Sequence, residues 1–96
     1  MAAYVIGHIS VKDTEKWVEY KRRVPATLTS CGGELVLRGQ RKAVLGGEHR
    51  HTDTVVIRFP DIEAVDEWFY SDAYQQLIPL RLQAAEVDLI SYESSS

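Results

Sequence analysis

The stretch TVVIRFPDIEAVDEWFYSDAY, residues 54–74, decides the fold, because it joins a strand pattern directly to a helix pattern. Val55, Ile57 and Phe59 alternate with other residues, which is the period of two expected for a strand with one buried face. The next residue is a proline, which lacks a backbone donor and ends the strand. Asp61 then suits the N-cap of a helix. The apolar stripe of that helix comprises Ile62, Val65, Trp68 and Phe69.

Strand and helix patterns on either side complete the order β-α-β-β-α-β. A first helix is capped by Asp13 and stopped by two glycines, and Pro25 inside it predicts a kink or a split after Arg23. Ser71 and Asp72 begin a second helical segment that continues as far as Ala85. The predicted strands are 3–11, 34–38, 54–59 and 87–93. This order is the ferredoxin-like arrangement of an α+β protein, with the helices on one face of an antiparallel sheet.

Length and composition limit the classes of function. The 96 residues predict one domain spanning 1–96, with 93–96 as a disordered tail. A formal net charge of −3 argues against a nucleic-acid partner, and no apolar run approaches the ~20 residues of a membrane span. The N-terminus lacks a secretory pattern, and a single cysteine suits a reducing compartment, so we expect a cytoplasmic protein.

The second face of the predicted sheet is too apolar to face water along its whole length. Strand parity places its polar residues, His8, Arg38 and Arg58, on this one face. The apolar residues expected beside them are Tyr4, Ile6, Val56 and Ile90. We therefore expect a homodimer in which two such sheets meet and close a barrel.

Short motifs in a characteristic order carry a family resemblance. They are Ala3-Tyr4-Val5-Ile6, Tyr20, Gly33, Arg38-Gly39, Leu45 to Glu48, Val55-Val56-Ile57, Phe59-Pro60, Ala64, Trp68, Ser71, Tyr74 and Arg81. Together they resemble the family called domain of unknown function 1330, within the dimeric α+β barrel superfamily. The resemblance implies a ferredoxin-like protomer and a dimer, and no particular activity. The chain departs from the family pattern at Gln40 and in the turn at Gly46-Gly47-Glu48.

His8, Arg38 and Arg58 are candidate ligand-binding residues. Cations on a desolvated sheet face need acceptors, and the arginine fork matches a carboxylate. The set therefore suits an anionic ligand such as a carboxylate or a phenolate. Alternatively, these residues pair with Glu34, Asp88 or an acid of a partner chain.

Four further residues suit a pocket between the helices and the sheet. Tyr20, Trp68, Tyr74 and Arg81 lie at helical spacing, which is more often typical of a core. Arg81 resists that interpretation, since an arginine in an apolar stripe needs a partner. It follows Tyr74 by two helical turns, so the two residues could mark the mouth of a pocket.

His49 and His51 form a His-x-His pattern. We interpret the surrounding residues, 48–53, as a solvated polar loop. A metal site or a ligand-facing histidine is the alternative, but metal binding usually needs a third ligand, and Arg50 disfavours a cation. We assign no metal and no cofactor.

No nucleophile motif or phosphate-binding loop occurs in the sequence. We therefore predict a small-molecule-binding homodimer whose ligand is anionic or aromatic. One alternative is a cofactor-independent monooxygenase or isomerase, with His8 as the base and Arg38 and Arg58 holding an anion. Another is a purely structural dimer without a ligand site.

Overall fold

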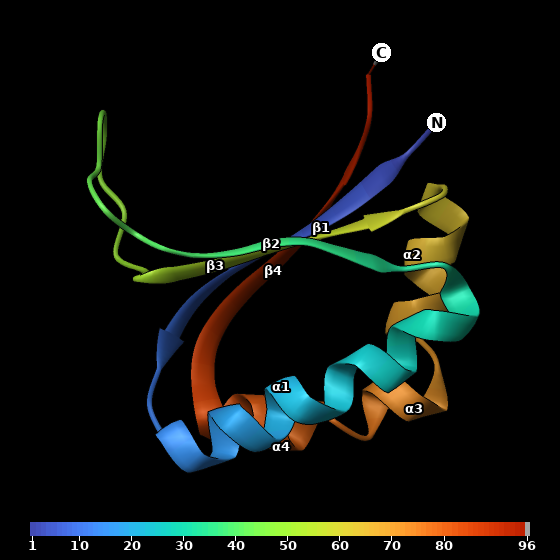
Figure 1. The fold of residues 1–96 in the computed structure, drawn as a ribbon, viewed down its shortest axis with the longest axis horizontal. Coiled ribbons are helices and arrows are strands. Elements are labelled where there is room, and N and C mark those ends of the chain that lie inside the picture. Colours follow the sequence, from blue (N-terminus) through green and yellow to red (C-terminus); the bar gives the residue numbers. More distant parts are fainter. Residues whose placement is uncertain (96) are drawn as a thin grey trace.

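A four-stranded antiparallel sheet is the centre of the computed structural model, which describes residues 1–95. The strands lie in the order β2-β3-β1-β4 (Figure 1). Their bounds are β1 Ala3–Val11, β2 Glu34–Gln40, β3 Asp53–Phe59 and β4 Ala85–Glu93. This arrangement confirms the α+β, ferredoxin-like prediction.

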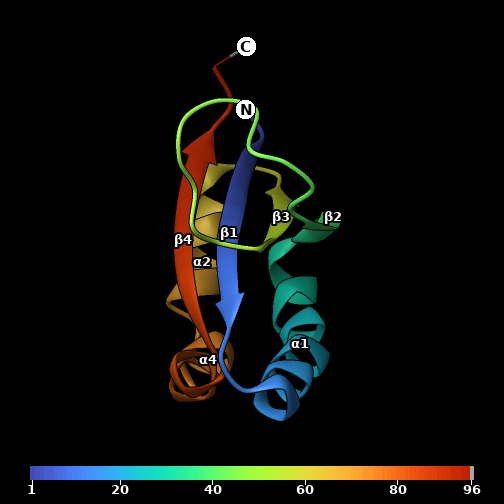
Figure 2. The ribbon, with the colours of Figure 1, turned by 90° about the vertical axis from the view of Figure 1, so that its left-hand side faces the viewer.

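The helices all lie on one face of this sheet (Figure 1). In Figure 2, α1 lies on the side of β2 and β3, and α2 and α4 lie on the side of β4. The helical bounds are α1 Thr14–Leu28, a 3₁₀ turn η1 Thr29–Cys31, α2 Ile62–Phe69, α3 Asp72–Gln75 and α4 Ile78–Ala84. None of these helices is long and apolar enough to cross a membrane.

The predicted helix caps are present. The Asp13 side chain accepts a hydrogen bond from the Lys16 backbone N–H at 3.1 Å, and Asp61 accepts from that of Ala64 at 2.8 Å. Each cap satisfies a donor that a helix N-terminus leaves without an intrahelical partner. The cap at Asp61 allows α2 to begin directly after β3, so this strand and helix pack against each other.

The first helix is continuous, so the predicted split after Arg23 does not occur, and α1 runs through Pro25 to Leu28. Val24, Thr27 and Leu28 are buried on either side of Pro25. This tertiary packing maintains the helix although proline removes one backbone hydrogen bond.

The second helical segment is divided, whereas the sequence predicts one helix as far as Ala85. It forms α3 and α4, with Pro79 in the first turn of α4, where a missing N–H has no cost. Ala85 has extended backbone and begins β4, two residues before the predicted strand.

The last strand ends where the sequence predicts. Glu93, which the sequence assigns to both the last strand and the tail, is the last residue of β4. The backbone N–H of Ser94 donates to the carbonyl oxygen of Ala2 at 2.9 Å. The last residue of the predicted tail, residue 96, lies outside the described part of the chain.

A bulge in β2 changes the direction of the side chains that follow it. Leu35 is opposite Ile57, but Leu37 is opposite Val56, so Val36 is an additional residue in the strand. Because side chains alternate with a period of two, one additional residue exchanges the two faces for the rest of the strand.

The core lies between the helices and the sheet and is centred on aromatic rings. The Trp68 ring lies 4.2 Å from that of Tyr74 and 5.5 Å from that of Phe59, measured between ring centroids. These three are the largest fully buried side chains among residues 1–95. The opposite face of the sheet carries no helix, and we refer to it as the open face (Figure 1).

Gly33 provides a test of this packing. A Cβ atom at Gly33 would lie 2.9 Å from Leu28 Cδ2 and 3.0 Å from Phe59 Cε1. We expect Gly33→Ala to lower the free energy of unfolding by about 1–3 kcal/mol, the usual cost of overpacking. Gly46→Ala is the control, since a Cβ atom there meets nothing within 4 Å. Urea denaturation measures both, and equal stability of the two variants would contradict close packing at Gly33.

Candidate functional site

The candidate cations are divided between the two faces of the sheet. After the bulge, Arg38 is opposite Val55, whose side chain packs against the helix-covered core. Arg38 therefore faces α1, and the prediction that it shares a face with His8 and Arg58 is wrong. The reason is the additional residue in β2. The prediction assumed that side chains alternate between the two faces along the whole strand, and the bulge interrupts this alternation.

His8 and Arg58 do share the open face, but they are far apart along it. Tyr4 is opposite Arg58, whereas His8 is opposite Thr54. Four residues of strand separate the two positions, or about 13 Å.

Arg38 lies beside a cavity of about 160 Å³ between α1 and the sheet. Its wall is mainly apolar, and two of the predicted pocket residues, Tyr20 and Trp68, contribute to it. The other principal wall residues are Ile9, Trp17, Val24, Leu28, Val55, Ile57 and Leu89. A cavity of roughly 150 Å³ can hold a benzene-sized molecule, so one substituted ring or a short branched chain fits this space.

Two cations lie at this cavity. Lys21 of α1 lines it together with Arg38 of β2. Neither side chain makes a hydrogen bond or an ion pair within residues 1–95. Both also border an adjoining recess that includes Asp53, but that carboxylate is not within ion-pair distance of either cation. The cavity thus combines an apolar interior with two unpaired positive charges.

Tyr74 and Arg81 lie behind the cavity wall. Arg81 Nη1 donates to Tyr74 Oη at 2.8 Å, and Tyr74 Oη lies 2.8 Å from Tyr20 Oη. Trp68 Nε1 donates to Thr27 Oγ1 at 2.9 Å, which satisfies the buried indole. Burial, followed by the nearby Tyr74 phenol, raises the pKa of Tyr20, so this phenol remains neutral at physiological pH.

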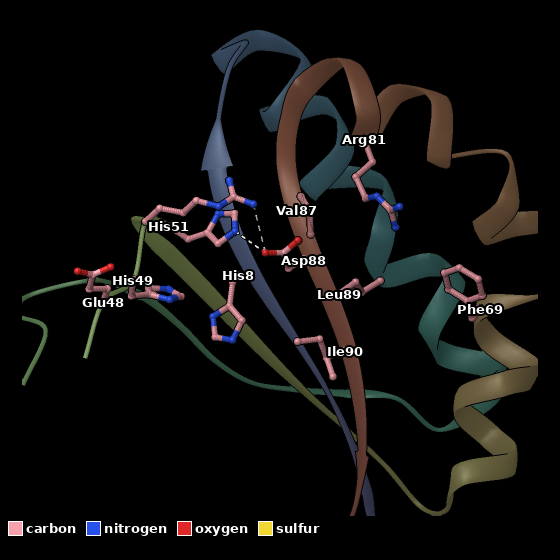
Figure 3. Close-up of a pocket in the computed structure, with 11 residues that line it drawn as sticks. His8, Glu48, His49, His51, Phe69, Arg81, Val87, Asp88, Leu89 and Ile90 are labelled. Carbon is pink, nitrogen blue, oxygen red and sulfur yellow. Dashed lines mark hydrogen bonds and ion pairs between the residues drawn. The ribbon is translucent and has the colours of Figure 1, made fainter. Parts of the chain in front are cut away.

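The structure also places three histidines close together on the open face (Figure 3). The His8 and His49 ring centroids are 5.0 Å apart, and those of His49 and His51 are 5.6 Å apart. Among residues 1–95, no group of three or more His, Cys, Asp or Glu side chains is arranged to hold a metal ion.

His51 is not part of a solvated loop, as the sequence analysis expects, because it is only 2% exposed. Its Nδ1 lies 2.9 Å from Ser10 Oγ, and its Nε2 lies 2.7 Å from Asp88 Oδ2. His51 therefore reaches over β1 to β4 and attaches the end of the β2–β3 connection to the sheet. No sequence pattern indicates this contact, because its partners are 41 and 37 residues away.

A wide hollow of about 850 Å³ is lined by these three histidines and by Arg81. Figure 3 shows His8, His51 and Asp88 on one side of β4, and Phe69 and Arg81 on the other. The strand separates the two sets, so the enclosed cavity beside α1 is the better candidate site. Lys21 was the missed residue there, although its position four residues after Trp17 places both on one helix face.

Comparison with known proteins identifies the family. The chain belongs to the family described as Domain of unknown function (DUF1330), whose model matches residues 2–94. No curated protein matches the sequence.

Solved structures share the fold at low sequence identity. A protein of unknown function from Rhodopseudomonas palustris is 17% identical with a TM-score of 0.82, over 99% of this chain and 83% of that one. A dimeric ferredoxin-like protein of unknown function from Jannaschia is 12% identical with a TM-score of 0.79, over 98% and 100%. SnoaB, a cofactor-independent oxygenase from Streptomyces nogalater, is 10% identical with a TM-score of 0.67, over 99% and 94%. At these identities the similarity shows the fold alone.

The contact between His51 and Asp88 predicts a pH dependence of stability. The hydrogen bond from His51 lowers the pKa of Asp88 in the folded protein. A carboxyl group with a lowered folded pKa stabilises the fold above its unfolded pKa, about 3.9, and loses this effect as the pH falls through the folded pKa. Asp88→Asn should therefore have a lower free energy of unfolding than the wild type above about pH 5. This difference in the free energy of unfolding, the stability gap, should narrow below about pH 4.

Urea denaturation at a series of pH values measures this gap. Asp66→Asn is the control, because the Asp66 carboxylate makes no hydrogen bond or ion pair within residues 1–95. A gap for Asp88→Asn that stays constant between about pH 3 and pH 7 would contradict the assignment.

Proposed function

We propose that this protein binds a small, mainly apolar anion, a carboxylate or a phenolate, in the cavity beside α1. The observation that carries the proposal is the pairing of an apolar cavity of about 160 Å³ with two cations that have no partner within residues 1–95. The cavity volume limits the apolar part of the ligand to about one ring.

The charge pattern supports an anion rather than a neutral molecule. The formal net charge of the protein is −3, yet the charged side chains that line this cavity are Lys21 and Arg38. The nearest acid on α1 is engaged elsewhere, because Glu19 forms ion pairs with Arg22 and Arg23. A guanidinium at the mouth of a cavity can hold a carboxylate through two hydrogen bonds while the apolar part is buried.

Catalysis by His8 is not part of this proposal. His8 is on the open face, and its Nδ1 lies 3.0 Å from Thr54 Oγ1, so it cannot act as the base for a ligand in the cavity. The similarity to SnoaB concerns the fold, and an oxygenase activity would need a base that the cavity wall does not provide. Binding is therefore the function that the geometry supports best.

Benzoate is a suitable probe, since it combines one ring with one carboxylate. We expect saturable binding in isothermal titration calorimetry, and we expect Arg38→Gln to raise the Kd about ten-fold, equivalent to about 1.4 kcal/mol. Arg22→Gln is the matched control, because Arg22 is on the same helix as Lys21 but its side chain is 69% exposed and paired with Glu19. Absence of benzoate binding, or equal weakening by the two variants, would contradict the proposal.

The open face supports a second element of the proposal, a homodimer of this chain. Large apolar side chains remain exposed there, including Leu37 at 47%, Ile90 at 41% and Tyr92 at 48%. Ile6 is half-buried and lies directly between Val56 and Ile90 in the sheet. A second copy of the same face would cover this surface, and dimeric assembly is reported for the similar Jannaschia protein.

Sedimentation mass tests the dimer. The wild type should sediment with twice the mass of one chain at micromolar concentration, and Ile90→Asp should sediment as a monomer, because it places a charge in the apolar face. Leu82→Asp is the control, since Leu82 is 59% exposed but belongs to α4, away from the open face. A monomeric wild type, or dissociation of both variants, would contradict a dimer formed through the open face.

A further inference from the structure

A chain of three hydrogen-bonded polar side chains, two buried tyrosines and the half-buried Arg81, begins at Arg81 and ends at the cavity. Its members come from three helices: Arg81 from α4, Tyr74 from α3 and Tyr20 from α1. Tyr74 is fully buried and Tyr20 is 8% exposed. Tyr20 also lines the cavity beside α1, which Tyr74 and Arg81 do not reach. The chain therefore connects a charge in the helical layer to the candidate site.

The direction of the hydrogen bonds follows from the donors available. Arginine can only donate, so the Tyr74 oxygen accepts from Arg81. The Tyr74 hydrogen then needs an acceptor, and Tyr20 Oη, 2.8 Å away, is the acceptor available. If Tyr20 donated instead, the Tyr74 hydrogen would have no acceptor at a fully buried position, which is unfavourable.

This direction leaves the hydroxyl hydrogen of Tyr20 free. No other acceptor for it occurs within residues 1–95, and Tyr20 belongs to the cavity wall. We infer that Tyr20 donates this hydrogen bond to an oxygen atom of the bound ligand. The inference rests on the proposed function and narrows it to an aromatic acid that carries a second oxygen acceptor, a carbonyl or phenolate oxygen, apart from the carboxylate at Arg38.

The charge of Arg81 makes Tyr20 a stronger donor. No carboxylate among residues 1–95 is within ion-pair distance of Arg81, and its Nε is buried without a hydrogen-bond partner. The positive charge is therefore not neutralised locally, and it polarises Tyr74, which in turn polarises Tyr20. Because burial raises the pKa of Tyr20, its phenol remains protonated and acts as a donor rather than as a base. Arg81 and Tyr74 are positioning residues that act through Tyr20.

A matched pair of probes tests the inference. 4-Formylbenzoate and 4-ethenylbenzoate have similar shape and the same carboxylate, but only the aldehyde has an oxygen acceptor at the end of the ring opposite the carboxylate. We expect the wild type to bind the aldehyde about ten-fold more tightly in calorimetry, which corresponds to one hydrogen bond of about 1.4 kcal/mol. Equal affinity of the wild type for the two acids would overturn the inference without use of any variant.

Variants then identify the donor. Tyr20→Phe should abolish the preference for the aldehyde, so that the Kd values of the two acids become equal within about two-fold. Tyr74→Phe keeps the Tyr20 hydroxyl but breaks its connection to Arg81, so the preference should fall to an intermediate value. A preference that survives in Tyr20→Phe would overturn the inference.

The outcomes also separate this inference from the function on which it rests. If both acids bind equally and Arg38→Gln weakens both, the anion site stands and the Tyr20 donor does not. If neither acid binds, the proposed function and the donor role are both overturned. Thermal denaturation of Tyr20→Phe and Tyr74→Phe confirms that the comparison uses folded protein.

Discussion

The packing of Trp68 holds the helical layer and the sheet together. Its ring contacts Phe59 of β3 and Tyr74 of α3, and its N–H donates to Thr27 of α1. A tryptophan is well suited to this position, because its large apolar ring fills the core while its one polar atom reaches a partner. Since Thr27 is near the end of α1, this contact fixes that end of the helix against the sheet. The cavity adjoins the preceding part of α1. Lys21, in this part of α1, and Arg38, in β2, both line the cavity.

One additional residue in β2 decides which face receives Arg38. Without the bulge at Val36, Arg38 would point to the open face, and the cavity would have only Lys21 as a cation. With the bulge, the two positive charges meet at an apolar cavity, and Leu37 points to the open face instead. A single insertion therefore places a charge at the candidate site and an apolar residue at the surface that we propose for the dimer.

The features that the sequence predicts are those that depend on neighbouring residues. The alternation in β3, the cap at Asp61 and the stripe ending at Phe69 are local, so the strand and α2 were predicted within one residue. The bulge is a property of the pairing between β2 and β3, and periodicity within one strand cannot reveal it. The contact of His51 with Asp88 likewise joins segments 37 residues apart. The apolar stripes of Tyr20 and Trp68 are also local, and both residues belong to the core as well as to the cavity wall.

The position of Arg81 is hard to explain by stability alone. A partly buried guanidinium without a carboxylate has lost hydration, and the Tyr74 phenol is a weaker acceptor than a carboxylate would be. Leucine at this position would fill the helical layer without that cost. The same charge becomes favourable when an anionic oxygen accepts a hydrogen bond from Tyr20, because the interaction is then between opposite charges. The partial burial of Arg81 would thus explain both a cost without the proposed ligand and a gain with it. The unpaired cation in the helical layer is in this way consistent with the proposed anion in the cavity.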